Sequence, residues 1–187
     1  MGRVGVRPLG GRAPAKDPLI RVTGPLPAHP LDRIDLLLLA AVQENARASN
    51  KELAALAGLA PSSCLARMRR LEDDGVIAGW HADLEPAALG LGLQALIAVQ
   101  LRLHVREAFE SFGQHVRALP EATAVYSLGG TTDFLVHVVC RDTEHLRALT
   151  MDAFTSRPEV SRIETSLVFS FTRSGLPIPD PATAGSR

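Results

Sequence analysis

The chain has 187 residues, of which 46% are hydrophobic and 21% are charged. A chain of this composition can bury a core, which excludes wholesale disorder, and its length allows one large domain or two small ones. Twenty basic residues balance twenty acidic ones, which argues against a general basic coat for nucleic acid. Any excess of positive charge lies within residues 1–30, where arginines outnumber acids.

The two cysteines, Cys64 and Cys140, are too few for a disulfide framework. Each lies in an apolar segment, so we expect buried free thiols in a reducing compartment. No apolar run approaches the roughly 20 residues that a membrane span needs. Residues 1–30 also lack the apolar stretch of a secretory signal. We therefore expect a cytoplasmic protein that makes no membrane contact.

Both ends of the chain are predicted to be disordered. Residues 1–30 form an arm rich in Gly, Pro, Arg and Ala without a hydrophobic period, and residues 174–187 form a tail that contains three prolines. Ordered structure is therefore expected between about residues 31 and 173.

Three short helices are predicted first. The first begins at Asp32 and ends near Asn45, with apolar residues at helical spacing. The second begins at a capping box of Ser49 and Glu52 and ends at Gly58. The third has Pro61 at its first position, runs through residues 62–74 and ends at Gly75. The tight turn between the second and third helices, centred on Gly58-Leu59, is typical of a helix-turn-helix.

The end of this first domain is less regular. On the third helix we expect Leu65, Met68 and Leu71 to face the core. The residues around 76–80 suggest a short strand, or wing. Residues 31–84 are thus predicted to form a winged helix-turn-helix, and residues 85–92, with Glu85-Pro86 and two glycines, to form a linker.

Residues 93–173 are predicted to form a second domain in the order βαββαβ. Alternating apolar residues predict strands near 95–103, 123–128 and 134–140, and three- and four-residue spacings predict helices around Phe109–Leu119 and after Asp142. The last strand is expected to place one set of side chains on one face: Ile163, Thr165, Leu167, Phe169 and Phe171.

This order predicts a ferredoxin-like α+β domain, in which a four-stranded antiparallel sheet carries both helices on one face. The other face then has no helix, although it carries apolar residues such as Leu96, Ala98 and Val168. An uncovered, partly apolar sheet is an association surface. We therefore expect at least a homodimer through this domain.

These residues resemble the Lrp/AsnC family of transcription regulators from about Leu31 to Phe171. The resemblance rests on the segments LDRID at residue 31, SNKEL at residue 49 and, above all, GLAPSSCLARMRRLE at residue 58. Gly75-Val76-Ile77, the loop from Gly130 to Phe134, and Thr165 also match. The resemblance implies a winged helix-turn-helix and a dimerising βαββαβ domain. It also implies octamers or other multiples of dimers, and effectors, commonly amino acids, bound in clefts between neighbouring C-terminal domains.

A helix-turn-helix places the start of its third helix against base edges in the major groove of double-stranded DNA. We expect four residues on the outer side of that helix, where arginine reads guanine and serine contacts bases or phosphates: Ser62, Ser63, Arg67 and Arg70. Three residues near the second helix are expected at phosphates: Arg47, Ser49 and Asn50. Taken alone, the arginine run is more often a solvated helix face balanced by acids; the flanking helices favour DNA. A dimer predicts an imperfectly palindromic operator.

A glycine-rich loop at residues 129–133 joins the second and third strands. Its glycines let backbone N–H groups approach a carboxylate, and its hydroxyls and Asp133 suit an ammonium group. Taken alone, such a loop is more often a tight hairpin turn. The resemblance favours an effector site of four residues: Gly130, Thr131, Thr132 and Asp133. Thr131 stands where many family members carry an acidic residue.

Two alternatives stay open. Some proteins of this two-domain plan resemble siroheme decarboxylases, which use His and Arg clusters. Here His104, His137 and His145 are scattered and no zinc pattern is present, so we expect no enzyme, metal or cofactor; His137 is expected to be a packed or interface histidine. The second alternative is a sensor or assembly module that does not bind DNA, and loss of DNA affinity on changing Arg67 and Arg70 to Ala would argue against it.

Overall fold

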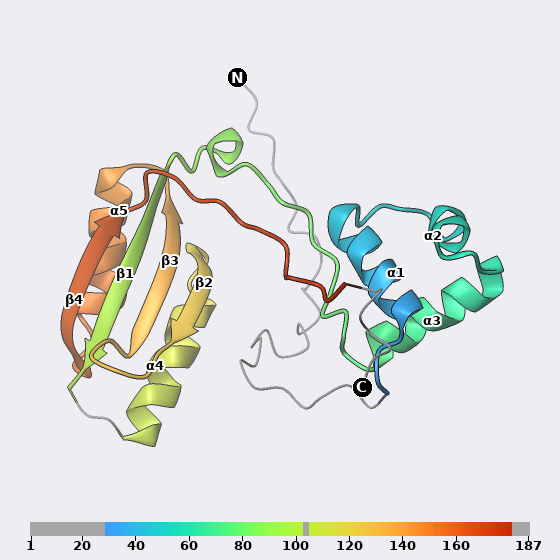
Figure 1. Cartoon of the computed structure of the whole chain (residues 1–187). Helices are drawn as coiled ribbons and strands as arrows, with labels where there is room; N and C mark the ends of the chain where they lie inside the picture. The colour runs from blue at the N-terminus through green and yellow to red at the C-terminus, as the bar shows by residue number, and fades with distance from the viewer. Residues whose placement is uncertain (1–28, 103–104, 181–187) are drawn as a thin grey trace, which may run out of the picture. The chain divides into compact units, whose positions relative to one another are not determined.

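The computed structural model describes residues 29–102 and 105–180. The chain divides into two compact units, one formed by residues up to Trp80 together with those from Gly175 onward, and the other by His81–Ser174. The first unit is helical, whereas the second is a sheet with helices (Figure 1). The predicted disordered arm over residues 1–30 lies almost entirely outside the described residues, as do residues 181–187 of the predicted tail.

Three helices build the first unit: α1 (Arg33–Glu44), α2 (Asn50–Ala57) and α3 (Pro61–Asp73). The predicted capping box is confirmed, since Ser49 accepts from the Glu52 N–H and Glu52 from the Ser49 N–H. Gly58 ends α2 at φ 66°, a left-handed conformation that glycine adopts without strain. A second capping box, of Asp32 and Asp35, begins α1 and was missed in the sequence.

Helix α3 turns a different face to the core than the sequence predicted. Cys64, Met68 and Leu71 are buried, whereas Leu65 is 40% exposed. The spacing of residues 64, 68 and 71 fits the helical period as well as the spacing of residues 65, 68 and 71 does. However, Cys64 and Leu65 themselves point in directions about 100° apart around the helix axis. The expectation that Leu65 faces the core is therefore wrong.

The strand predicted around residues 76–80 is not formed. Residues 74–85 are turns and extended chain instead. The Ile77 N–H returns to the carbonyl of Leu71 at 3.0 Å, and the Trp80 indole N–H donates to Glu72 at 2.9 Å. A strand needs a hydrogen-bonded neighbouring strand. Ile77 and Trp80 form hydrogen bonds to the C-terminal end of α3 instead.

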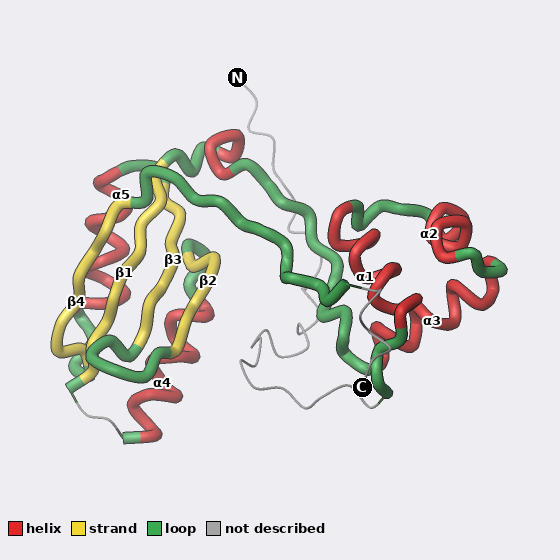
Figure 2. Tube along the Cα trace, in the orientation of Figure 1, coloured by secondary structure: helices red, strands yellow, loops and turns green. Residues whose placement is uncertain are grey.

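The second unit has the predicted βαββαβ order (Figure 2). A 3₁₀ turn, Pro86–Leu89, lies in the predicted linker. The strands run antiparallel in the order β2-β3-β1-β4. The elements that follow the turn are β1 (Leu93–Leu101), α4 (Arg106–Ala118), β2 (Ala122–Ser127), β3 (Phe134–Cys140), α5 (Thr143–Leu149), a π-helical turn (Thr150–Thr155) and β4 (Val160–Leu167).

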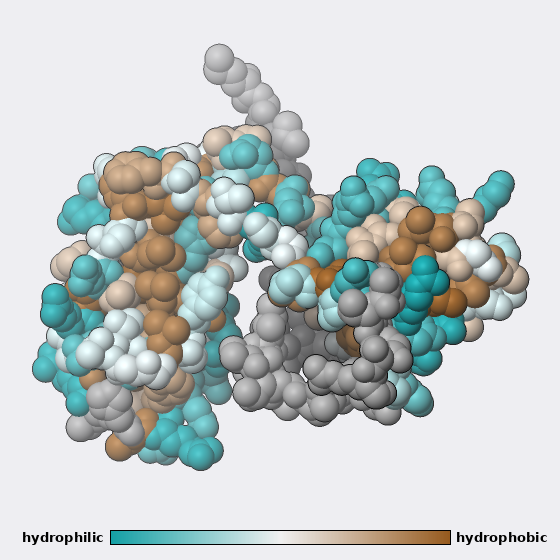
Figure 3. Space-filling model, in the orientation of Figure 1, coloured by the Kyte–Doolittle hydropathy of each residue, from teal (hydrophilic) through white to brown (hydrophobic). Residues whose placement is uncertain are grey.

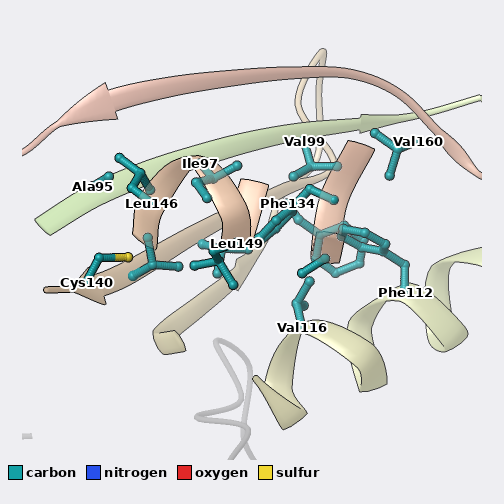
Figure 4. Close-up of a cluster of buried hydrophobic side chains, with 14 of the residues drawn as sticks. Ala95, Ile97, Val99, Phe112, Val116, Phe134, Cys140, Leu146, Leu149 and Val160 are labelled. Atoms are coloured by element: carbon teal, nitrogen blue, oxygen red, sulfur yellow. The ribbon is translucent and has the colours of Figure 1, made fainter. Parts of the chain in front are cut away.

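Both helices cover the same face of this sheet, which confirms the α+β prediction (Figure 1). Alternate residues of β1 point into the core between sheet and helices, as Ile97 and Val99 do in Figure 4. The rings of Phe112 on α4 and Phe134 on β3 lie 5.1 Å apart there. Residues of the opposite face, including Leu96 and Ala98, meet no helix and are only partly buried by their neighbours.

The last strand is shorter than predicted. Strand β4 ends at Leu167, which pairs with Ala95. One further bond joins the Val168 N–H to Gln94. Because β1 begins at Leu93, the chain beyond has no neighbour to pair with. Phe169 and Phe171, predicted on the strand, therefore lie beyond it and are 96% and 63% exposed.

Part of the predicted tail is fixed. The Leu176 N–H donates to Gln43 Oε1 on α1, and Gln43 Nε2 donates to the Leu176 carbonyl, each at 2.9 Å. The prediction that disorder begins at residue 174 is wrong for this short segment. The Gln43 side-chain amide thus satisfies both the backbone N–H and the backbone carbonyl of Leu176, as a neighbouring strand would.

Candidate nucleic-acid interface and effector loop

The start of α2 is fastened to the start of α3. The Asn50 side-chain amide donates to the Pro61 carbonyl at 2.9 Å, and Ser49 uses its hydroxyl in the cap of α2. Both side chains, expected at phosphates, are thus engaged within the unit. Arg47 has an exposed side chain, as its expected role requires. The turn between α2 and α3 is therefore held from both ends.

The two arginines expected on the outer side of α3 bend toward α1 instead. Arg67 Nη1 lies 2.6 Å from Asp32 and 2.9 Å from Asp35, and Arg70 Nη2 lies 2.6 Å from Asp35. Asp35 is fully buried. Both guanidinium groups supply the pairing that a buried carboxylate needs. Whether Arg67 and Arg70 also contact DNA, as the sequence predicts, stays a prediction.

The contact between Asp32 and Arg67 also shifts the pKa of both groups. The hydrogen bond to Asp32, followed by the contacts with Asp35, raises the pKa of Arg67. Partial burial alone would raise the pKa of Asp32, but the Asp35 N–H and the Arg67 guanidinium hold it below its ordinary value. Both shifts favour the charged forms of Asp32 and Arg67, which form an ion pair with each other.

Ser62 and Ser63 are exposed at the start of α3, as predicted. Their exposed neighbours on the helix include Leu65, Ala66 and Arg69, which the sequence argument did not select. Counting the helical period from Cys64 rather than from Leu65 places Ala66 and Arg69 toward solvent. The choice of Leu65 instead of Cys64 as the residue that faces the core therefore hid these exposed positions.

The four predicted effector residues lie beside two different hollows. Gly130 and Asp133 line a cavity of about 550 Å³, together with residues of α4 and the chain before it: Val105, Arg106, Phe109 and Glu110. Thr131 and Thr132 line a smaller hollow of about 160 Å³ beside Gln100, Arg162 and Glu164. The loop thus separates two hollows rather than closing one.

Asp133 forms hydrogen bonds to the backbone on both sides of the loop. Its side chain is 4% exposed, and Oδ2 accepts the Leu101 N–H at 2.8 Å. Its own N–H donates to the Val99 carbonyl, and its carbonyl accepts the Leu128 N–H, each at 2.9 Å. These bonds fix the end of the loop, and Gly130 within it, at φ 135°, lines the larger cavity.

The described histidines and cysteines are separately placed, and His104 lies outside the described residues. His137 Nδ1 lies 2.8 Å from Thr123 Oγ1, and Nε2 lies 3.0 Å from Gln94 Oε1; burial lowers the pKa of this histidine. His145 contacts Glu121 instead. Cys64 and Cys140 are buried free thiols, as predicted, and burial raises the pKa of each. Within the described ranges, no three His, Cys, Asp or Glu side chains gather as a metal site would require.

Comparison with known proteins assigns both units. Residues 31–78 match a family model described as winged helix-turn-helix DNA-binding, and residues 94–175 match the Lrp/AsnC ligand binding domain. The chain is 43% identical over 151 residues to the HTH-type transcriptional regulator AldR of Mycolicibacterium smegmatis, which covers 81% of this chain and 88% of that protein. The chain belongs to the Lrp/AsnC family of transcription regulators.

Other Lrp/AsnC proteins extend the likeness over both units. The leucine-responsive regulatory protein of Escherichia coli is 34% identical over 142 residues, which cover 76% of this chain and 87% of that protein. A solved structure, a Neisseria meningitidis transcriptional regulator in complex with L-Met, superposes with a TM-score of 0.73 at 34% identity, covering 80% of this chain and 96% of that one. No helix in the described part of the chain is long and apolar enough to cross a membrane.

Proposed function

We propose that this Lrp/AsnC protein binds specific duplex DNA through α3 and that a small molecule, of the amino-acid class, modulates the binding. The observation that carries the proposal is the exposed start of α3, held by Asn50 beside a capped α2. The N-terminal residues of such a helix face base edges in the major groove. Ser62 and Ser63 lie there, and Arg47 supplies a positive charge for phosphate.

The larger cavity is the effector site in this proposal. Its wall combines the Arg106 guanidinium and the Glu110 carboxylate, 3.7 Å apart, with the apolar ring of Phe109 and the backbone of Gly130. A free amino acid carries a carboxylate, an ammonium group and a side chain, and each finds a partner of suitable chemistry here. The L-Met complex of the Neisseria relative supports the same ligand class.

The helix-free face of the sheet is the pairing surface in this proposal. Figure 3 shows a brown band of apolar residues over β1 and β3 on this face, which includes Leu96, Ala98 and Leu135. An exposed apolar band of this kind favours association with a second copy. We propose a homodimer, with higher multiples of dimers, in which two α3 helices address two half-sites.

The remaining parts of the proposal concern boundaries and setting. We propose a DNA-binding domain over residues 31–84, a linker over 85–92 and a sensing and pairing domain over 93–173. The protein would act in the cytoplasm, without catalysis, metal or cofactor. The regulator names of the relatives support this assignment.

Selection of bound duplexes from a random pool, repeated with single amino acids at millimolar concentration, tests the proposal. We expect a consensus with imperfect twofold symmetry and half-sites about 34–36 Å apart, or a multiple of that distance. At least one amino acid should change the affinity by about 5- to 150-fold. Failure of the full-length protein to bind any duplex at low salt would refute the DNA-binding function.

A further inference from the structure

The described arginines of α3 differ in what they contact. Arg67 and Arg70 are ion-paired to α1. Arg69 is exposed, and its side chain makes no ion pair with any described residue. The three arginines thus fall into two classes on one helix.

Helical geometry places Arg69 near the outward side of α3, but it does not by itself distinguish Arg69 from Arg70. At about 100° per residue, Ser62 and Ala66 point almost directly away from the buried stripe of Cys64, Met68 and Leu71. Arg69 and Arg70 both leave the helix about 50° from that direction, on opposite flanks. The ion pairs separate them, because the flank of Arg70 is the one that faces Asp35.

The cost of moving each arginine also differs. Releasing Arg67 or Arg70 toward DNA would remove one of the two ion-pair partners of Asp35. Because Asp35 is fully buried, the loss of a charged partner there is unfavourable. Arg69 has no such bond to break. Of the three arginines on α3, Arg69 alone can therefore turn its guanidinium N–H donors toward a base without breaking an ion pair to a described residue.

We propose that Ser62, Ala66 and Arg69 form the base-reading face of α3, whereas Arg67 and Arg70 hold the helix on α1. This inference rests on the DNA-binding function proposed above and names the residues that set its specificity. Arg69 matches guanine, whose O6 and N7 accept from one guanidinium. Ala66, with exposed Leu65 beside it, matches the methyl group of thymine.

The test compares base preference with stability for four variants of the full-length protein. Arg69→Ala should lower affinity for the selected duplex by about 10- to 100-fold and abolish the guanine preference at one position of each half-site. Arg69→Lys should keep the affinity for unselected DNA but lose that preference, since lysine cannot bond both guanine acceptors in the planar fork of arginine.

Arg67→Ala should weaken binding to all duplexes alike, leave the ranking of bases unchanged and lower the unfolding temperature of the first unit. The fluorescence of Trp80, the single tryptophan, reports that unfolding because its indole contacts Glu72 on α3. Arg147→Ala removes the same charge from α5, in the other unit, and should change neither the base preference nor the Trp80 transition.

The outcomes separate this inference from the function beneath it. If Arg69→Ala keeps the guanine preference, or if Arg67→Ala changes the ranking of bases while the Trp80 transition stays unchanged, the assignment of the reading face is overturned but DNA binding stands. If the unaltered protein selects no duplex, both fall together.

Discussion

Arg67 Nη1 lies 2.9 Å from Oδ1 of Asp35, a carboxylate that no solvent reaches. Arg70 Nη2 takes the other oxygen of the same carboxylate at 2.6 Å. One carboxylate on α1 thus binds two arginine side chains on α3, which lie 32 and 35 positions further along the chain. Both ion pairs therefore join α3 to the first turn of α1.

Changing Asp35 to Ala should lower the free energy of unfolding of the first unit by roughly 3 kcal/mol, the low end of what removal of one partner from a buried pair costs, since both arginines stay partly exposed. Urea unfolding followed by Trp80 fluorescence measures the change. Asp73→Ala is the matched control, because Asp73 is exposed on α3. An unchanged urea midpoint for Asp35→Ala would show that the ion pairs contribute nothing.

Changing Arg106 to Ala should weaken binding of the amino acid that alters DNA affinity on the order of tenfold, through loss of a charged hydrogen-bond donor from the larger cavity. Calorimetric titration of the purified protein gives the dissociation constant. Arg162→Ala, at the smaller hollow, is the control and should have little effect. The reverse pattern would move the effector to the Thr131 side of the loop.

Changing Leu96 to Lys should dissociate the homodimer, because it puts a charge in the middle of the apolar band on the helix-free face. Sedimentation velocity at micromolar concentration distinguishes the two states. Leu89→Lys introduces the same charge at a residue that is 62% exposed in the 3₁₀ turn before the sheet, and should leave the dimer intact. A Leu96→Lys protein that stays dimeric would place the pairing surface elsewhere.

The stability of the second unit should fall as the pH drops below the ordinary histidine pKa of 6.5. Burial lowers the pKa of His137 in the folded state, so the unfolded chain takes up the proton first, and stability is lost as the pH falls through the folded pKa. Urea midpoints from pH 7.5 to 5.5 should therefore decline more steeply in the unaltered protein than in His137→Gln. Parallel profiles would mean that His137 does not contribute.

The features that the sequence predicted correctly are governed by neighbouring residues. The capping box of Ser49 and Glu52 spans four residues, Gly58 ends its helix by its own backbone freedom, and alternation along β1 needs only the period of a strand. The order of elements followed from these local rules, and the antiparallel sheet followed from the order.

The features that it missed depend on distant partners. The ion pairs of Arg67 and Arg70 need the position of α1, and no local rule supplies that position. The end of β4 is set by where β1 begins, about 75 residues earlier. The sequence pattern could not distinguish Cys64 from Leu65 as the core residue, because each of them, together with Met68 and Leu71, satisfies the helical period.

The paired hydrogen bonds between Gln43 and Leu176 attach the chain that follows the sheet to α1. Both ends of the ligand-binding unit run into the DNA-binding one, so the former is an insertion within the latter rather than an appendage to it. The two units are therefore joined by two segments of chain, one around residues 81–92 and the other between the end of β4 at Leu167 and Leu176.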